Sequence, residues 1–440
     1  VGDYYESKGY PKAEVDSELI RQPGNPTLIL RYNLKTGTQV RIGNIRIVGN
    51  NSTRRSVIQK RLTFHEGDLL IRSQLFESQR NLYRTRNFQL VNIEPEESET
   101  PGVNDVLVEV TESRKYRTTY GIRYNTETDV EGEVVLQDSR VFGTSHNFSL
   151  FTRLNSLEQD FGANYSIPPI SKGLIRGLDW DYLISARYER EEHETFLDHS
   201  ATLSFQKQFR LFGPFVSLAE YRYERDRITA NVNTGPFTFD ETTTISEVVG
   251  TLLADTRDDP INAKRGYFVS LENGFAPSGL QGDQLFQRFY YQFFYFKQLG
   301  RIVWANAFRT GFAFPDAQRL IISERFLAGG SSTIRGFKLD TVGPKDPIQH
   351  DPLGGEGLII INQEVRFPLF KWFGGAAFYD GGNVWVKANE MSFGDLRHTF
   401  GLGLRLDSPF GVLRFDWGHN PDPQEGEAQN VFHFGFGQAF

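Results

Sequence analysis

The feature that most constrains this 440-residue sequence is a two-residue alternation of apolar and polar side chains, which recurs from about residue 115 to the end. In the run 402–407, leucines occupy every second position, and glycine or charged residues occupy the positions between them. The run 413–417 repeats the pattern with Leu413, Phe415 and Trp417 against Arg414 and Asp416. Period-two alternation predicts strands with one apolar face. The opposite faces carry too many charges for a dry sandwich core and suit a wet lumen surrounded by lipid.

About sixteen such runs follow one another, which is an even number typical of an antiparallel transmembrane β-barrel. They lie near 116–124, 129–137, 146–155, 159–167, 180–189, 198–208, 213–224, 244–255, 266–277, 284–297, 301–312, 357–367, 372–381, 397–407, 411–417 and 430–440. We therefore predict a 16-stranded barrel over residues 115–440. A soluble array of β-sandwiches is the alternative.

The composition agrees with a membrane barrel and excludes other classes. The chain has 38 Phe, 18 Tyr and 42 Gly, a mean hydropathy of -0.43, and no stretch near the ~20 apolar residues of a spanning helix. A net charge of -7 argues against nucleic-acid binding, and the absence of cysteine excludes disulfides and thiolate chemistry. The chain starts at Val1 with no leader, so we expect any export signal to be removed or to lie outside this sequence.

The first quarter of the chain has a different pattern. Residues 1–41 contain two apolar runs that cannot close a core alone, and we interpret them as the C-terminal part of a preceding, truncated module. Residues 42–114 predict the order β-α-α-β-β. This unit resembles a POTRA domain through Gly49-Asn50, Gly67, Leu82-Tyr83, Asn87-Phe88 and the closing 108–112. The resemblance makes residues 1–41 part of another POTRA domain.

A long Gly-, Ser- and Pro-rich insertion, at about 313–356, interrupts the alternating strands. Loops of this length are usually functional or disordered. This one carries Phe326, Leu327, Ile334 and Phe337, which gain only by burial, and it places Arg335 between Ile334 and Gly336. We predict a lid loop that folds into a cavity and positions one guanidinium there. The alternative is a surface loop with an isolated arginine.

Four motifs in order identify a family. They are Ile334-Arg335-Gly336-Phe337, the run 362–369 around Glu364, the run 378–385 around Asp380, and the turn 255–260 followed by Arg265-Gly266-Tyr267. With the POTRA unit and the terminal Phe440, they resemble the BamA/TamA superfamily of outer-membrane assembly proteins over residues 42–440. The compact connections lean toward the TamA-like side of that superfamily.

This resemblance gives the lid a binding site. It implies that Arg335 enters the barrel lumen and that Glu364 and Asp380 face the lumen from neighbouring strands. A charge-assisted contact between them would hold the lid in place. The alternative is that all three are ordinary lumen charges that meet water.

The last strand is the second candidate site. Phe432, Phe434, Phe436 and Phe440 are predicted on one lipid-facing side, with Gly435 and Gly437 on the other. The strand must close against the polar first strand, about 116–124, and a weak seam would expose two strand edges. The resemblance implies that this seam is a lateral gate through which client strands are added.

The chain end also resembles the outer-membrane C-terminal signal, except that Gln438 replaces a hydrophobic residue. The alternative is an ordinary closing strand and sorting tag.

The sequence shows no catalytic, nucleotide-binding or EF-hand motif, and the run 380–383 lacks a calcium ligand series. We expect no enzyme, no catalytic residues, no cofactor and no metal.

The resemblance implies an outer-membrane insertion factor with a periplasmic POTRA segment. Its partners would be unfolded outer-membrane protein clients and outer-membrane lipid. The POTRA edge would receive clients or a periplasmic or inner-membrane-anchored partner, or the domain is only a spacer. A two-partner-type protein secretion pore is the first alternative, and a barrel enzyme such as a lipase is the second.

Overall fold

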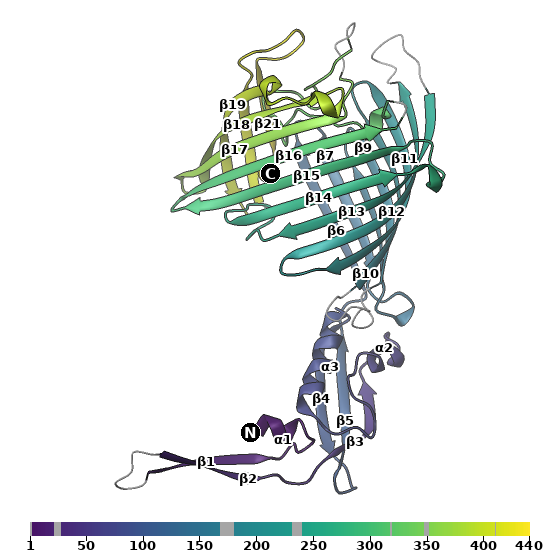
Figure 1. Cartoon of the computed structure of the whole chain (residues 1–440), viewed down its shortest axis with the longest axis vertical. Coiled ribbons are helices and arrows are strands. Elements are labelled where there is room, and N and C mark those ends of the chain that lie inside the picture. The colour runs from purple at the N-terminus through teal and green to yellow at the C-terminus, as the bar shows by residue number, and fades with distance from the viewer. Residues whose placement is uncertain are drawn as a thin grey trace. The chain divides into compact units, whose positions relative to one another are not determined.

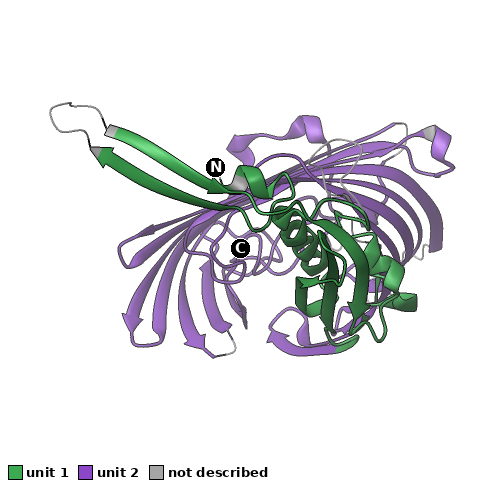
Figure 2. Ribbon diagram, turned by 90° about the horizontal axis from the view of Figure 1, so that it is seen from below, with its two compact units in different colours: residues 1–117, 137–148, 167–171 green, residues 118–136, 149–166, 172–440 purple. Residues whose placement is uncertain are grey.

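A computed structural model of the chain describes residues 2–21, 28–167, 180–230, 240–316, 319–346, 352–409 and 411–440. The chain divides into two compact units (Figure 2). Unit 1 contains residues 1–117, 137–148 and 167–171, and unit 2 contains 118–136, 149–166 and 172–440. No helix among the described residues is long and apolar enough to cross a membrane.

Unit 1 holds the predicted small domain (Figure 1). It begins with α1 (Gly2–Glu6) and an antiparallel pair, β1 (Glu14–Arg21) and β2 (Leu28–Lys35). Then follow β3 (Arg41–Val48), α2 (Arg55–Gln59), α3 (Arg72–Arg84), β4 (Phe88–Glu97) and β5 (Val103–Glu112), in the predicted order β-α-α-β-β. The sheet order is β3-β5-β4, with β3 parallel and β4 antiparallel to the central β5.

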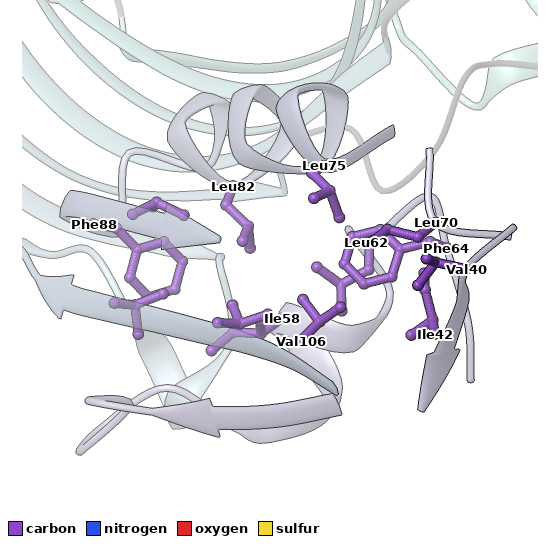
Figure 3. Packing of buried hydrophobic residues seen from close by; sticks show 13 residues of the cluster. Val40, Ile42, Ile58, Leu62, Phe64, Leu70, Leu75, Leu82, Phe88 and Val106 are labelled. Atoms are coloured by element: carbon purple, nitrogen blue, oxygen red, sulfur yellow. The ribbon is translucent and has the colours of Figure 1, made fainter. Parts of the chain in front are cut away.

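A dry apolar core holds this domain together (Figure 3). Helix α3 contributes Leu75 and Leu82, seven residues apart and therefore on one helix face. They pack with buried residues of the strands and connecting turns, including Val40, Ile42, Ile58, Leu62, Phe64, Leu70, Phe88 and Val106. Gly49 follows directly after β3 and has φ +84°. A Cβ there would lie within 2 Å of the Val110 carbonyl oxygen, so only glycine fits.

Sixteen strands, β6 to β21, form the predicted antiparallel β-barrel. Their bounds are β6 (Tyr116–Asn125), β7 (Asp129–Asp138), β8 (Asn147–Leu154), β9 (Glu158–Ile167), β10 (Trp180–Glu192), β11 (Phe196–Arg210), β12 (Phe215–Ala230), β13 (Asp240–Asp255), β14 (Gly266–Ala276), β15 (Phe286–Leu299), β16 (Ile302–Pro315), β17 (Gly357–Phe370), β18 (Phe373–Trp385), β19 (Arg397–Ser408), β20 (Gly411–His419) and β21 (Asn430–Phe436). Short 3-10 turns lie at Val141–Gly143, Ser278–Leu280, Ile322–Glu324, Ala388–Glu390 and Phe393–Asp395. Each strand is a neighbour of the next along the chain, and β6 and β21 are the ends of this order.

The alternation in the sequence becomes an inside-out distribution of side chains. On β19, Leu402 and Leu404 are exposed on the outside of the barrel. Arg405, the next residue along the strand, points the other way and is buried. On β20, Phe415 is exposed and Asp416 is fully buried. The apolar faces therefore form the outer surface of the barrel, and the charged faces line its lumen.

Candidate functional site

The loop between β16 and β17, residues 316–356, is called the lid below. Within it, residues 317–318 and 347–351 lie outside the described residues. Phe326, Ile334 and Phe337 of the lid are buried in one apolar cluster with Ile360 of β17 and Val384 of β18. Leu327 is half-buried. The lid thus lies against the inner wall of the barrel.

Arg335 is the centre of the lid contact. Its Nε and Nη2 donate to the two carboxylate oxygens of Asp380 at 2.8 and 3.0 Å, and its Nη1 donates to Glu364. Its backbone N–H also donates to Asp380, at 3.0 Å. The guanidinium carbon lies 3.4 Å from the centroid of the Phe378 ring, in a cation–π contact. The structure therefore brings Arg335, Glu364 and Asp380 together as one buried, hydrogen-bonded ion cluster.

Gly336 allows this close approach. Its φ of +114° is one that side chains rarely adopt, and a Cβ there would lie 2.8 Å from Thr399 Cγ2. On the facing strand, a Cβ at Gly418 would lie 2.4 Å from the Gly336 nitrogen. The lid backbone is thus in contact with β19 and β20, and neither Gly336 nor Gly418 has room for a side chain.

Three further charged residues join the cluster. Arg366 donates to Glu364 at 2.7 Å, Arg405 contacts both Glu364 and Asp416, and Asp416 lies 3.4 Å from Arg335. Burial lowers the pKa of Arg335, but the carboxylates of Asp380 and Glu364 raise it by more than burial lowers it. The net pKa is therefore raised, and the guanidinium stays charged. Sequence reasoning did not assign Arg366, Arg405 or Asp416 to the site; for Arg405 and Asp416, the alternation along the strands 402–407 and 413–417 was the one signal that they face the lumen.

The fourth family motif forms the turn between β13 and β14. The Asp258 carboxylate accepts the backbone N–H groups of Asp259, Lys264 and Arg265 at 2.9 to 3.1 Å. This turn reaches the lumen cluster through Ala263, whose carbonyl oxygen accepts from Arg366 at 3.3 Å. The motif is therefore a structural turn, and this hydrogen bond connects it directly to the site.

The seam lies where the two end strands of the barrel meet. The Thr126 N–H, just after β6, donates to the Phe434 carbonyl oxygen at 3.1 Å, and the Phe434 N–H donates to Thr126 Oγ1 at 3.2 Å. The ring of Tyr124 lies 5.8 Å from that of Phe434. Strand β21 is otherwise paired with β20, from Leu413–Phe436 to His419–Asn430.

Of the four phenylalanines predicted on one face of the last strand, the three that lie on β21 share a face, and Phe440 does not. Phe432 and Phe436 are exposed on the outer face with the half-buried Phe434, and Gly435 lies on the other face. The prediction is wrong for Gly437 and Phe440, since β21 ends at Phe436 and Gly437 turns the chain with φ +81°. The Phe440 ring instead packs 6.0 Å from Phe294.

Glu127, in the turn after β6, was missed by the sequence reasoning. Its carboxylate accepts the Ser331 backbone N–H at 2.6 Å and the Ser331 hydroxyl at 2.8 Å, so it holds the lid. The same carboxylate lies 3.4 Å from Nδ1 of His433 on β21. Burial raises the pKa of Glu127, but hydrogen bonds from His433 and Ser331 lower it more. Nothing in its sequence surroundings distinguishes Glu127 from an ordinary turn glutamate.

One carboxylate group among the described residues has metal-like spacing: Glu158, Asp160 and Glu189 place oxygens within 4.8 Å of one another. Arg187 compensates it, with hydrogen bonds of 2.8 Å to both Asp160 and Glu189. These carboxylates therefore already have a cationic partner from the protein.

Comparison with known proteins agrees with this geometry. The Omp85 superfamily domain matches residues 140–440, and the POTRA family, described as a surface antigen variable number repeat, matches residues 40–113. The chain is 26% identical to the outer membrane protein assembly factor BamA of Nitratidesulfovibrio vulgaris over its whole length and 56% of that protein. It is 27% identical to BamA of Neorickettsia risticii over 89% of this chain and 54% of that one.

The chain spans about half the length of these curated relatives. Among solved structures, BamA from Haemophilus ducreyi lacking POTRA domains 1-3 matches with a TM-score of 0.79 and 16% identity. That match covers 99% of this chain and 92% of the other, and shows the shared fold. The expected TamA-like character stays a prediction. With a family match over residues 140–440, a POTRA domain and a 16-stranded barrel, the chain belongs to the Omp85 superfamily and is a bacterial outer-membrane protein.

Proposed function

We propose that this protein is an outer-membrane assembly factor that inserts unfolded β-barrel clients into the membrane through the seam between β6 and β21. The observation that carries the proposal is the seam itself, where the end strands of the sheet meet through Thr126 and Phe434. Strand edges offer backbone N–H and C=O groups that can pair with an incoming strand. The naming of the relatives as outer membrane protein assembly factors supports the same function.

The proposed mechanism is not enzymatic. A client strand would pair with one seam edge and gain backbone hydrogen bonds there, while its apolar face would be buried in lipid. The protein would lower the kinetic barrier by offering an edge inside the bilayer. The free energy would come from the client's own strand pairing and burial, with no nucleotide and no metal.

We place the POTRA domain in the periplasm, where its sheet has two edge strands, β3 and β4. The edge strand β4 carries Leu90, whose side chain is exposed. An extended client segment, or a periplasmic or membrane-anchored partner, would add to such an edge as a further strand. A peptide that protects the β4 amides from hydrogen exchange would support this role, and unchanged exchange with every client would leave the domain as a spacer.

A reversible lock on the seam tests the function directly. A Cβ at Gly435 would lie 3.5 Å from that of Asn125, within the range of disulfide bonds, and the chain contains no other cysteine. Asn125→Cys with Gly435→Cys should block the folding of a denatured barrel protein by proteoliposomes when oxidised and permit it when reduced. The reduced form controls for the loss of Asn125 from its turn.

A matched disulfide separates the seam from the barrel as a whole. Leu271 and Tyr291 are direct partners on β14 and β15, far from the seam in strand order. Leu271→Cys with Tyr291→Cys should leave insertion intact when oxidised. Full activity of the oxidised seam variant would refute the proposal, and steady single-channel conductance without insertion would favour a secretion pore.

A further inference from the structure

The last four residues of the chain lie inside the lumen. After β21, the Gly437 N–H donates to the Val412 carbonyl oxygen at 2.8 Å, and the chain turns inward. Ala439 is buried, and the Phe440 ring lies 6.0 Å from Phe294 and 6.2 Å from Phe296, both of which are buried. The guanidinium of Arg366 lies 5.7 Å from the same ring. Residues 437–440 are called the tail below.

Gln438 connects the tail to two separate parts of the barrel. Its side-chain oxygen accepts from Nε of Arg405 at 2.9 Å. Its amide nitrogen donates to Oδ1 of Asn262, in the turn between β13 and β14, at 3.0 Å. A hydrophobic residue at this position, as the outer-membrane C-terminal signal favours, could make neither contact.

The contact with Arg405 continues to the lid. Arg405 Nη2 donates to Glu364 at 3.3 Å, and its Nη1 donates to Asp416. The same Glu364 oxygen accepts from Arg335 of the lid. Because the donors of a guanidinium are held in one plane, Arg405 cannot follow a displaced Glu364 without disturbing its hydrogen bond to Gln438.

The lid therefore reaches β21 at two places, at the middle of the strand and just beyond its end. At the middle of the strand, Ser331 contacts Glu127, which pairs with His433. Beyond its end, Arg335, Glu364 and Arg405 lead to Gln438. Strand β21 has seven residues, and its ladder partner is β20. Its free edge is thus supported from within the lumen by contacts that begin in the lid.

We propose that Gln438 is a positioning residue that couples the docked lid to the free edge of the seam. While Arg335 is bound, the chain of contacts through Arg405 holds the tail in the lumen and β21 beside β6. Release of Arg335 frees Arg405 and the tail together, and the seam widens. The coupling is a property of the barrel and needs no client.

Distance across the seam is the readout. Tyr120 on β6 and Phe432 on β21 are both exposed on the outer face, and the cysteine-free chain allows specific spin labels at Tyr120→Cys and Phe432→Cys. Double electron–electron resonance on the full chain in liposomes then gives the distance distribution. Gln438→Leu and Arg335→Ala should each shift it to longer and broader distances. Their combination should be no wider than Arg335→Ala alone, because both break the same chain.

Two further variants separate coupling from general destabilisation. Gln438→Glu keeps an acceptor for Arg405 and should retain the wild-type distribution. Asn164→Leu removes a lumen amide whose oxygen accepts from the Ser185 hydroxyl at 2.6 Å; it takes no part in the contacts from Arg335 to Gln438, so it should also leave the distances unchanged.

Folding of every variant is checked first by its heat-modifiable mobility on gels, and Gln438→Ala replaces Gln438→Leu if the latter does not fold. A wild-type distribution for Gln438→Leu, additive widening in the double variant, or equal widening in Asn164→Leu would each overturn the proposal.

Discussion

The POTRA domain has an apolar core, whereas the barrel buries a cluster of charged side chains beside its apolar clusters. In the POTRA domain, Leu82 and Phe64 are among thirteen apolar residues that form a dry core. In the barrel, the fully buried side chains include Arg335, Glu364 and Asp380, while Leu402 and Leu404 face outward. The difference follows from the surroundings: water around the POTRA domain drives apolar groups inward, whereas lipid around the barrel removes that drive, so the lumen holds charged groups as well as the apolar residues of the lid.

The two kinds of core should respond differently to substitution. A dry core loses contact area and gains a cavity when a side chain is shortened. A buried ion cluster loses a partner and leaves the remaining charge uncompensated, which costs more than the pair contributed. The substitutions that follow test this contrast.

Arg335→Ala should have the largest effect, a loss of about 3–5 kcal/mol of barrel stability, because Asp380 and Glu364 lose their shared cation. Urea unfolding in micelles and heat-modifiable gel mobility would measure it. Arg335→Lys should recover only part of the loss, since an ammonium cannot bind both carboxylates in the same geometry. Unfolding of Arg335→Ala at the wild-type urea concentration would contradict an ion cluster as the core of the lid contact.

Leu82→Ala should destabilise the POTRA domain by about 2–5 kcal/mol, because Leu82 is fully buried on α3. Hydrogen exchange of the full-length chain, followed for residues 41–112, would report this loss. Phe76→Ala on the same helix is the control and should change stability by no more than about 0.5 kcal/mol, since Phe76 is exposed. A parallel loss of barrel stability in Leu82→Ala would show that the two cores are not independent.

A pair of leucines with similar exposure sharpens the comparison. Leu402, in the middle of β19, is 57% exposed, and Leu90, on β4, is 54% exposed. Leu402→Arg should cost about 2–4 kcal/mol because it places a charge in lipid. Leu90→Arg should change stability by no more than about 0.5 kcal/mol, because that side chain meets water. Equal losses of stability for the two substitutions in liposomes would contradict the view that the barrel surface meets lipid and the POTRA surface meets water.

The smallest effect should be a pH dependence of the lid. His193, between β10 and β11, lies 3.4 Å from Asp340 of the lid and 3.4 Å from Glu191. Burial lowers the pKa of His193, but Asp340 and Glu191 raise it more, to about 9. A raised pKa means that this stabilisation is complete below the unfolded value near 6.5 and is lost as pH rises through about 9.

The stability of the wild-type barrel should therefore decline between about pH 6.5 and 9 more steeply than that of His193→Gln. Urea midpoints measured across that range would show the difference. Parallel slopes for the two proteins would mean that the imidazole does not hold Asp340 as a cation.

Much of the fold could be predicted from local pattern. Two-residue alternation identified the sixteen strands because each strand is half lipid-facing and half lumen-facing. The motif around Arg335 and the carboxylates Glu364 and Asp380 could be paired through the family resemblance. Phe440 could not be placed, because the alternation gives no sign that Gly437 turns the chain before it. Glu127 and Gln438 were invisible as site residues because their partners lie 204 and 33 residues away in the chain.

The sequence by itself determined the barrel, the small β-α-α-β-β domain and the insertion of a lid, since periodicity and turn chemistry act between near neighbours. Only the tertiary structure decided which further charges join Arg335, Glu364 and Asp380, where the end strands touch and how the tail is held. Those contacts join β6, the lid, β19 and the chain terminus, and their geometry depends on closure of the sheet rather than on any local preference.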